Sequence, residues 1–477
     1  MQTVLNLAYH KDLKDKNNLR IKEQEKQYQY YAGNAHELKL FLITALEKTY
    51  KPDDVKDMQL QWVNITKKIV DQMSIVYLEP AQRKLMKDDD TDDDLTKYYN
   101  DLMPIDMNNS DKRAHRLAKL HNTSLTQIMF DKHTGKFRYK TLPSYLYQIK
   151  YDGDRLTEVS YDKYFHDSGE DILYTVVWTD ETLLRRDALG NESTLPDKDD
   201  TENPFGVLPF SFLRLKESID FWGEGESDVV NVNEQVNLLL TKLINRDIIL
   251  GTEGTTITTN LGLNKKGDIK DGRREIRIGV GHPINVEGVR IDDVLPSIQH
   301  IGFDPHIVEV KETIDWYIRT IANFNGLNPS NILSEIKDTS DYQKVMDAVE
   351  QMEIRKDDIE PCRIYEHNRF NITRIVNNKF VGTETGRQYK LKEIPEDTEF
   401  MVDFADIEIH LTPKDQRDDW DWKLKNNLIT LKDILKKQNP DLNDEQITEQ
   451  LENNKLLNSK LGGRMGMFEL LTEGQSQ

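Results

Sequence analysis

Four acidic residues in the middle of the chain are the first candidates for chemistry, because clustered carboxylates can hold a divalent metal ion. They are Asp180, Glu181, Asp187 and Asp197. No histidine accompanies them, and Arg185 and Arg186 lie among them as simpler charge partners. A chain this rich in acidic residues produces such groups by chance, so the pattern does not predict a metal site.

Two further acidic patterns also have simple structural explanations. Glu366-His367-Asn368 resembles part of a nuclease centre, but it lies inside a long amphipathic helix, which predicts a solvated helical face. The acidic run 88–94 lacks the glycine and the spaced acids of a calcium loop. That run is therefore interpreted as a solvated loop or the start of a helix.

The motifs of common enzymes are missing from the sequence. It contains no phosphate loop, no dinucleotide-binding glycine fingerprint, no His-Glu-x-x-His pair and no nucleophile elbow. The single cysteine, Cys362, excludes an intrachain disulfide and a cysteine zinc cage, and favours a reducing compartment. We therefore expect no catalytic residue, no bound metal and no cofactor.

Composition limits the class of protein further. The 477 residues allow roughly three domains. With 31% charged residues and a mean hydropathy of -0.70, the chain is predicted to be water-soluble, without a membrane span or a secretory signal. The net charge of -20 argues against a tight DNA-binding surface, because such surfaces neutralise phosphates with a basic surplus. It is compatible with a protein that lets DNA slide past.

Two amphipathic helices with matched stripes are the most informative elements. Each stripe alternates in steps of three and four residues, which is typical of a helix that packs on another helix. Asn233 and Asn237 are expected on an opposite, polar face of the first helix, and Asp304-Pro305 is expected to begin the second. The stripes are Val229, Val232, Val236, Leu239 and Leu243, then Ile307, Val310, Ile314, Tyr317 and Ile321.

Such a helical hairpin buries little surface by itself. We expect it to be stable only beside further copies of itself or under a large covering part of the protein. The alternative is an ordinary pair of helices inside an enzyme. The insertion between the helices predicts short strands, at 255–259 and 276–280, around a basic loop. That loop is either a solvated turn or a contact surface for DNA or an acidic partner; its cations are Lys265, Lys266, Lys270, Arg273, Arg274 and Arg277.

The remaining elements predict a mixed α+β chain. Helical patterns cover residues 20–31, 59–78 and 341–377, and Pro361 should kink or break the last of these. Alternating patterns predict strands within 136–180 and 399–411. Helices are expected again after residue 420, followed by a loose tail.

The order of many weak motifs resembles the portal proteins of tailed double-stranded DNA bacteriophages. The resemblance covers roughly residues 20–455, and a departure occurs at 328–340, where the usual small residues are replaced. The segments that carry it are Tyr28–Gly33, Trp62–Gln72 running into Leu78–Pro80, Leu208–Phe210, Phe221–Asp228 and Thr412–Asp415.

This resemblance implies a portal fold assembled as a ring of twelve subunits at one capsid vertex of the virion, built in the host cytoplasm. It implies a wing at 1–222, stem helices at 223–250 and 304–324, and a β-rich clip at 251–303. A tunnel loop at 325–340 would follow, then the long wing helix and strand at 341–413, and the crown and tail at 414–477. In the tunnel loop, Glu335, Lys337 and Asp338 would face the DNA channel, and the six basic residues of the insertion would dock partners.

The implied partners are further copies of the chain, the terminase large subunit, head-completion and tail proteins, major capsid and scaffolding proteins, and DNA passing through the channel. The family acts as a conduit for genome packaging and ejection, and its motor ATPase is a separate chain. The alternatives are another ring-forming virion adaptor or a phage-encoded metal-dependent nuclease.

Overall fold

The computed structural model contains both helices and sheets, so the chain is α+β. It divides into two compact units, residues 1–338 with 349–406, and residues 339–348 with 407–477. The structure describes residues 2–87, 90–152, 155–167, 170–196, 200–217, 221–223, 225, 227–245, 255–259, 297–301, 306–333, 341–405, 420–426, 429–438 and 446–454.

The first unit begins with four helices, of which the first is much longer than the pattern at 20–31 indicated. The helix predicted at 59–78 is wrong at both ends, because only residues 65–73 are helical. Residues 59–64 form an extended segment before it, which we call the strap. Asn64 begins that helix by accepting a hydrogen bond from the Lys67 amide. The bounds are α1 (Gln2–Ala32), α2 (Ala35–Leu46), α3 (Pro52–Lys56) and α4 (Ile65–Met73).

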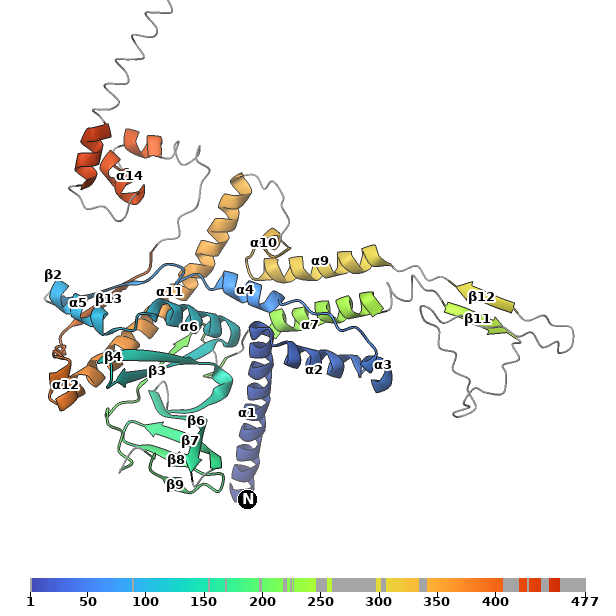
Figure 1. Ribbon diagram of the computed structural model, residues 1–477, viewed down its shortest axis with the longest axis horizontal. Coiled ribbons are helices and arrows are strands. Elements are labelled where there is room, and N and C mark those ends of the chain that lie inside the picture. The colour runs from blue at the N-terminus through green and yellow to red at the C-terminus, as the bar shows by residue number, and fades with distance from the viewer. Residues whose placement is uncertain are drawn as a thin grey trace, which may run out of the picture. The chain divides into compact units, whose positions relative to one another are not determined.

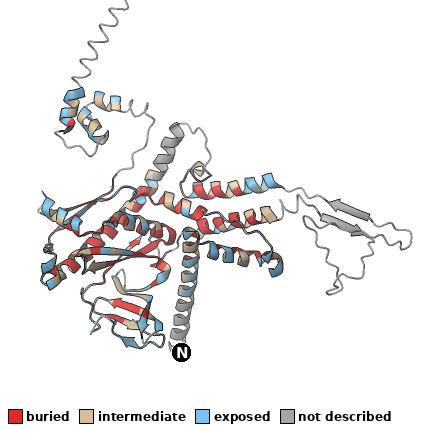
Figure 2. Ribbon diagram, in the orientation of Figure 1, coloured by how far each residue is buried: buried red, intermediate tan, exposed pale blue. Residues whose placement is uncertain are grey.

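The main core of this unit lies where two helices meet two small antiparallel sheets. The sheets have the strand orders β13-β1-β2 and β10-β3-β4. Figure 2 shows the buried residues gathered on α6, on the neighbouring strands and on the middle of α11. The elements are β1 (Gln82–Lys87), β2 (Asp90–Thr91), α5 (Asp93–Leu102), α6 (Met107–His121), β3 (Thr123–Asp131), β4 (Lys136–Leu142), β10 (Phe210–Arg214) and β13 (Glu399–Asp403).

A separate sheet of five strands follows the chain as an antiparallel meander. The strands predicted within 136–180 are confirmed as β4 to β7. Tyr147, Val159, Val176 and Trp178 cover one side of the meander with a separate apolar cluster. The elements are η1 (Ser144–Leu146), β5 (Tyr147–Asp152), β6 (Arg155–Asp167), β7 (Glu170–Thr179), β8 (Leu183–Arg186) and β9 (Glu192–Ser193).

The two predicted stripes form α7 and α9, which lie side by side in opposite chain directions (Figure 1). Between them in the sequence, β11 and β12 pair in antiparallel register, so the strand predicted at 255–259 is confirmed and that at 276–280 lies outside the described residues. The second helix begins at Ile307, two residues beyond the predicted Pro305. The elements are α7 (Ser227–Lys242), β11 (Thr255–Thr259), β12 (Ser297–Ile301), α9 (Ile307–Phe324) and α10 (Pro329–Leu333).

The long helix is α11 (Asp341–Val381), followed by α12 (Glu384–Gln388). It continues through Pro361, so the predicted break does not occur there. Proline removes one backbone hydrogen bond from a helix, and the buried Tyr365 and Phe370 in the next turns hold the helix against the core.

The second unit is described mainly as short helices. These are α14 (Leu431–Gln438) and helical stretches at 420–425 and 446–454. Ile447 is its one fully buried hydrophobic residue among those described. Across the described part of the whole chain, no helix is both long enough and apolar enough to cross a membrane.

Candidate assembly interface

The predicted stripes of α7 and α9 meet inside one subunit. Most of their residues belong to a single apolar cluster with α4 and α10, so α4 supplies a cover that the sequence did not reveal. The role of these residues in ring packing stays a prediction. Val229, Val236, Ile314 and Ile321 are buried in the cluster, and Val232, Leu239, Val310 and Tyr317 pack against it half-buried.

Two residues of the stripes behave differently. Leu243 is half-buried beyond the cluster, and Ile307 is exposed at the start of α9, so the packing predicted for Ile307 is not made within the subunit and stays a prediction for the assembled stem. Ile318 and Ala322 are buried instead. The buried face of α9 is therefore shifted around the helix relative to the prediction, because α10 covers it as well as α7.

The predicted polar face of α7 is also buried, because it holds the extended strap. Asn233, Asn237, Thr241 and Asn245 lie four residues apart, and the first three are fully buried. Together their side chains bond the backbone of strap residues 59, 61 and 63 and of residue 65, the first residue of α4. Four helical residues rise about 6 Å, and two residues of extended chain span about 6.6 Å, so the two repeats match.

Asn233 makes the densest set of these contacts. Its Oδ1 accepts hydrogen bonds from the Ile65 amide at 2.9 Å, the Thr66 amide at 2.9 Å and the Thr66 hydroxyl at 3.0 Å. Its Nδ2 donates to the Val63 carbonyl at 2.8 Å. The amides of 65 and 66 open α4 and have no partner within that helix, so Asn233 caps α4 from another helix.

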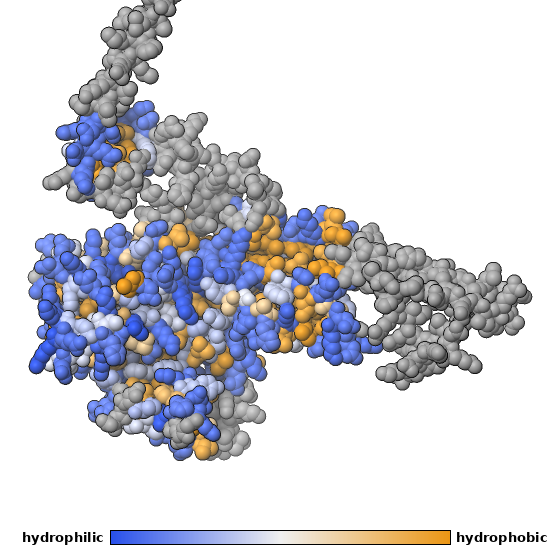
Figure 3. Space-filling model, viewed as in Figure 1, coloured by the Kyte–Doolittle hydropathy of each residue, from blue (hydrophilic) through white to orange (hydrophobic). Residues whose placement is uncertain are grey.

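Helix α9 carries a second apolar face that the described part of the subunit does not cover. Trp316 is 60% exposed and Phe324 is 84% exposed, and Val308 is exposed as well. Glu309 and Glu312 are exposed on the same side of the helix, which is opposite to the buried Ile314, Ile318 and Ile321. We call these five residues the α9 outer face. In Figure 3 apolar surface gathers over α7 and α9.

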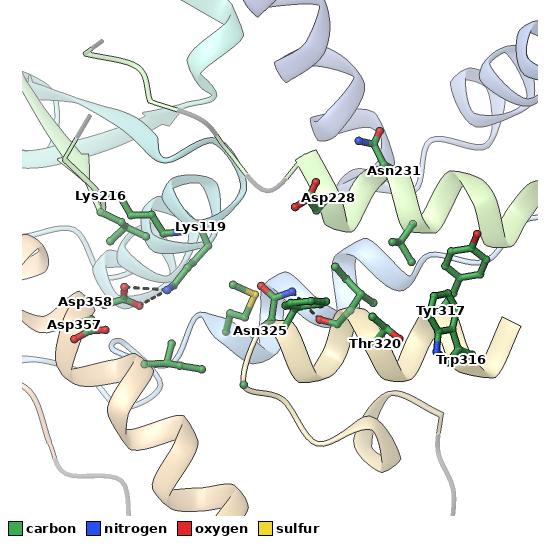
Figure 4. A pocket seen from close by; sticks show the side chains of 17 residues that line it. Lys119, Lys216, Asp228, Asn231, Trp316, Tyr317, Thr320, Asn325, Asp357 and Asp358 are labelled. Carbon is green, nitrogen blue, oxygen red and sulfur yellow. Dashed lines mark hydrogen bonds and ion pairs between the residues drawn. The ribbon is translucent and has the colours of Figure 1, made fainter. Parts of the chain in front are cut away.

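A groove of about 730 Å³ continues from this face toward α6 and α11. Trp316, Tyr317 and Thr320 line it from α9, and Asp228 and Asn231 line it from α7 (Figure 4). Its other wall is polar and is formed by residues of α6 and α11. The surface next to the α9 outer face is thus apolar at one end and charged at the other.

The charged end of the groove is tied together by ion pairs. The Lys119 ammonium lies 2.8 Å from Asp358 Oδ2, and His115 Nε2 lies 3.1 Å from the same oxygen. Burial by itself would raise the pKa of Asp358, but the His115 hydrogen bond and the Lys119 charge hold it below its ordinary value. Burial lowers the pKa of His115, which keeps that ring neutral at pH 7. These partners fix α6 to α11 at this end of the groove.

The prediction that Glu366 lies on a solvated face is wrong. Its carboxylate is fully buried and accepts hydrogen bonds from Arg83 at 2.7 Å and from Arg369 at 2.6 Å. Asp111 pairs with both arginines, so two acids balance two cations. Burial opposes ionisation of Glu366, but the two guanidinium groups lower its pKa. A charge-balanced cluster of this kind joins β1, α6 and α11 and has no free acid for catalysis.

The central acids do not form a metal site within the described residues. Asp187 accepts hydrogen bonds at 2.8 Å from the Leu189 and Asn191 amides, so it shapes the turn between β8 and β9. Asp180 and Glu181 lie in the turn before β8, and Asp197 is outside the described residues. No group of three histidine, cysteine, aspartate or glutamate side chains able to hold a metal occurs in the described part of the chain.

The predicted contact residues of the insertion and the tunnel loop lie outside the described residues. This applies to Glu335, Lys337 and Asp338 of the loop. It also applies to the basic set Lys265, Lys266, Lys270, Arg273, Arg274 and Arg277. Their roles stay predictions.

Two solved structures to which this chain is similar are distant from it in sequence. No protein-family profile and no curated protein matches the chain. A chain of the structure described as "Neck of empty GTA particle computed with C6 symmetry" is similar at 11% identity and a TM-score of 0.37, over 77% of this chain and 88% of that one. A chain of the "Virion of native gene transfer agent (GTA) particle" is similar at 11% identity and a TM-score of 0.36, over the same shares. Likenesses this distant carry no argument about function.

Proposed function

We propose that this chain is a phage portal protein. Twelve copies form a ring at the unique capsid vertex, and double-stranded DNA passes through the ring during packaging and ejection. The terminase large subunit docks first, and head-completion and tail proteins dock later. One observation carries the proposal: α9 exposes Trp316 and Phe324 on a second apolar face although its first face is already buried in the subunit.

An exposed face of this kind supports assembly. Large aromatic side chains are enriched in protein interfaces, and contiguous exposed apolar surface marks a contact site. The α9 outer face belongs to a helical pair that packs well internally, so the exposed residues are not the remains of a poorly formed core. A helix that packs on its own subunit with one face and exposes a second apolar face is suited to the wall of a ring, where the second face can contact a neighbouring subunit.

The charge of the chain supports a conduit through which DNA slides. Twelve copies at -20 each carry a formal charge of about -240, so the assembled protein repels the DNA backbone over most of its surface. Local lysines would then supply only weak sliding contacts. A protein that held DNA tightly would release counterions through a basic surplus instead.

The proposal assigns ATP hydrolysis to the terminase and no reaction to this chain. The sequence contains no phosphate loop. The buried carboxylates Glu366 and Asp358 are occupied by arginine, lysine and histidine partners, which suits a structural role. The basic residues of the insertion would dock the terminase and the adaptors, and the capsid and scaffolding proteins would contact the body.

Two rival functions remain distinguishable by experiment. A different ring-forming virion adaptor would also expose an assembly face, but it would not support packaging when it replaces the portal in a reconstituted system. A metal-dependent nuclease would act as a discrete enzyme on DNA. We expect the purified chain to elute as a large oligomer and to leave plasmid DNA intact in the presence of Mg²⁺ or Mn²⁺. Cleavage that survives stringent purification and is lost in a point variant would overturn the proposal.

A further inference from the structure

The two outer strands of the sheet β10-β3-β4 differ in the side chains that they carry. Strand β4 has Lys136, Arg138 and Lys140 at alternate positions, and the last two are exposed. Charged side chains along an edge strand oppose pairing with a further strand. Strand β10 has one charged residue, Arg214, at its last position. The edge formed by β10 therefore lacks the protection that the edge formed by β4 has.

The main chain of β10 directs every second residue away from β3. The two strands pair in antiparallel register, and the Ile128 amide donates to the Pro209 carbonyl at 2.8 Å. Ladder bonds in such a pair recur at every second residue, so Ser211 bonds β3, whereas Phe210 and Phe212 point to the outer edge. In the described part of the chain, no hydrogen bond engages the main-chain groups of Phe210 or Phe212. Their amides and carbonyls are thus available to a further strand.

A groove of about 430 Å³ runs beside this edge, and Phe210, Ser211 and Phe212 line it from β10. We call it the β10 groove. Successive side chains of a strand point to opposite faces of the sheet. The Ser211 hydroxyl donates to the Tyr365 carbonyl of α11 at 3.1 Å, whereas Phe210 belongs to the apolar cluster of the meander. The β10 groove therefore lies between α11 on one face of the sheet and the meander on the other.

The walls of the β10 groove suit an uncharged polypeptide segment. Leu156 and Leu208 contribute apolar surface, and Asp180 is the one ionisable residue in the lining. Helix α11 contributes two half-buried isoleucines and two exposed asparagines, whose carboxamides both donate and accept hydrogen bonds. These four residues are Asn368, Asn371, Ile372 and Ile375. Apolar side chains and main-chain amides are thus the groups that the groove is able to hold.

We propose that the β10 groove binds an extended segment of a partner protein, which adds a fourth strand to the sheet. An extended segment presents carbonyls and amides at the same two-residue repeat, so its main-chain dipoles complement those of Phe210 and Phe212. Its alternate side chains face α11 and the meander, where Ile372 and Leu156 favour aliphatic or β-branched residues. All the lining residues belong to one subunit, so the inference does not depend on the proposed ring.

Hydrogen exchange at single amides tests this pairing. The probe is a capped peptide of alternating valine and threonine with a terminal lysine for solubility. In the free protein the amides of Ser211 and Leu213 should exchange more slowly than those of Phe210 and Phe212, because only the first two bond β3. At a peptide concentration about ten times its Kd, exchange at Phe210 and Phe212 should slow about tenfold. Exchange at Ser211 and Leu213 should change little.

One control peptide and two variants locate the binding. The same peptide with methylated amide nitrogens keeps its side chains and loses its main-chain donors, so it should give no slowing. Asn371→Trp starts from an exposed position on α11 and fills the β10 groove, so it should weaken peptide binding at least about tenfold. Arg363→Trp alters an exposed residue of the same helix outside the lining and should change peptide binding by less than about twofold.

The outcomes separate strand addition from other kinds of binding. Slowing at Phe210 and Phe212 that is lost with the methylated peptide and in Asn371→Trp supports the proposal. Equal slowing by both peptides, or no slowing up to the solubility limit of the probe, would overturn it. Slow exchange of both amides in the free protein that disappears on dilution would show that a second copy of this chain fills the groove, and would also overturn it. None of these results depends on whether the protein forms rings, so the portal proposal is tested separately.

Discussion

Replacing Asn233 by alanine tests how α7 holds the strap. The side chain serves three donors and one acceptor, all within 3.0 Å, and it is fully buried. Each buried polar group left without a partner costs about 1 to 3 kcal/mol. The costs of neighbouring groups do not add in full. We therefore expect Asn233→Ala to destabilise the junction of strap and α4 by about 3 to 5 kcal/mol.

Hydrogen exchange with residue resolution measures this effect locally. In the unaltered protein the amides of Gln59, Gln61, Val63 and Ile65 should be protected, since each is bonded to a side chain of α7 or of the helical turn that follows it. The strap amides between them should exchange faster. A loss of 3 kcal/mol would speed exchange around residue 65 by about 100-fold in Asn233→Ala.

Two variants control the experiment. Asn233→Asp keeps an acceptor for the three donors at the start of α4 and loses only the bond to the Val63 carbonyl, so we expect a cost of about 1 to 2 kcal/mol. Gln235→Ala alters an exposed residue of the same helix and should change stability by less than about 0.5 kcal/mol. Two results would refute this account of the strap. One is equal amide exchange rates around residue 65 in Asn233→Ala and Gln235→Ala. The other is protection of all strap amides in the unaltered protein, without alternation between bonded and unbonded residues.

Three further predictions concern charged and titratable residues. Glu366→Gln should leave two buried arginines with one acid and lower the free energy of unfolding by about 3 to 5 kcal/mol, measured by urea denaturation. Burial lowers the pKa of His121 to about 3, so its contribution to stability is complete above pH 6.5 and is lost as pH falls. In His121→Leu the acid-side slope of stability against pH should therefore fall by up to about 1.4 kcal/mol per pH unit, and an unchanged slope would contradict this. Charge reversal of Arg273 and Arg274 should weaken terminase or adaptor pull-down while rings persist, whereas reversal of Lys337 should alter packaging or DNA retention only.

Sequence patterns were sufficient to predict a helix or a strand where only one side of that element is buried. The stripes at 229–243 and 307–321 predicted two paired helices, and alternation within 136–180 predicted strands that the structure confirms. Both signals come from burial on one side of an element, which leaves a period in the sequence. The domain boundaries and the roles of the predicted contact residues stay predictions.

The strap shows why other parts could not be predicted. Residues 59–64 have a helical pattern, but side chains of α7 bond their backbone amides and carbonyls and keep the segment extended. The partner lies about 170 residues away in the sequence, so no local pattern contains it. Asn233 and Glu366 were expected at the surface for the same reason, since the groups that satisfy them come from distant elements.

The second face of α9 left a sequence signal that is easy to overlook. Trp316 and Phe324 lie outside the three-four stripe, on a side of the helix that also carries Glu309 and Glu312. A large aromatic residue among charged positions is unusual for a solvated helical face and favours a covered one. The structure was needed to show that nothing within the described part of the subunit covers it.

Electron microscopy of the purified protein tests the central claim most directly. Negative-stain class averages should show rings with a central hole wide enough for duplex DNA, and twelvefold symmetry should emerge when the averages are aligned. Compact particles of one chain, at 55.7 kDa and without a hole under conditions in which the protein is folded, would contradict the account.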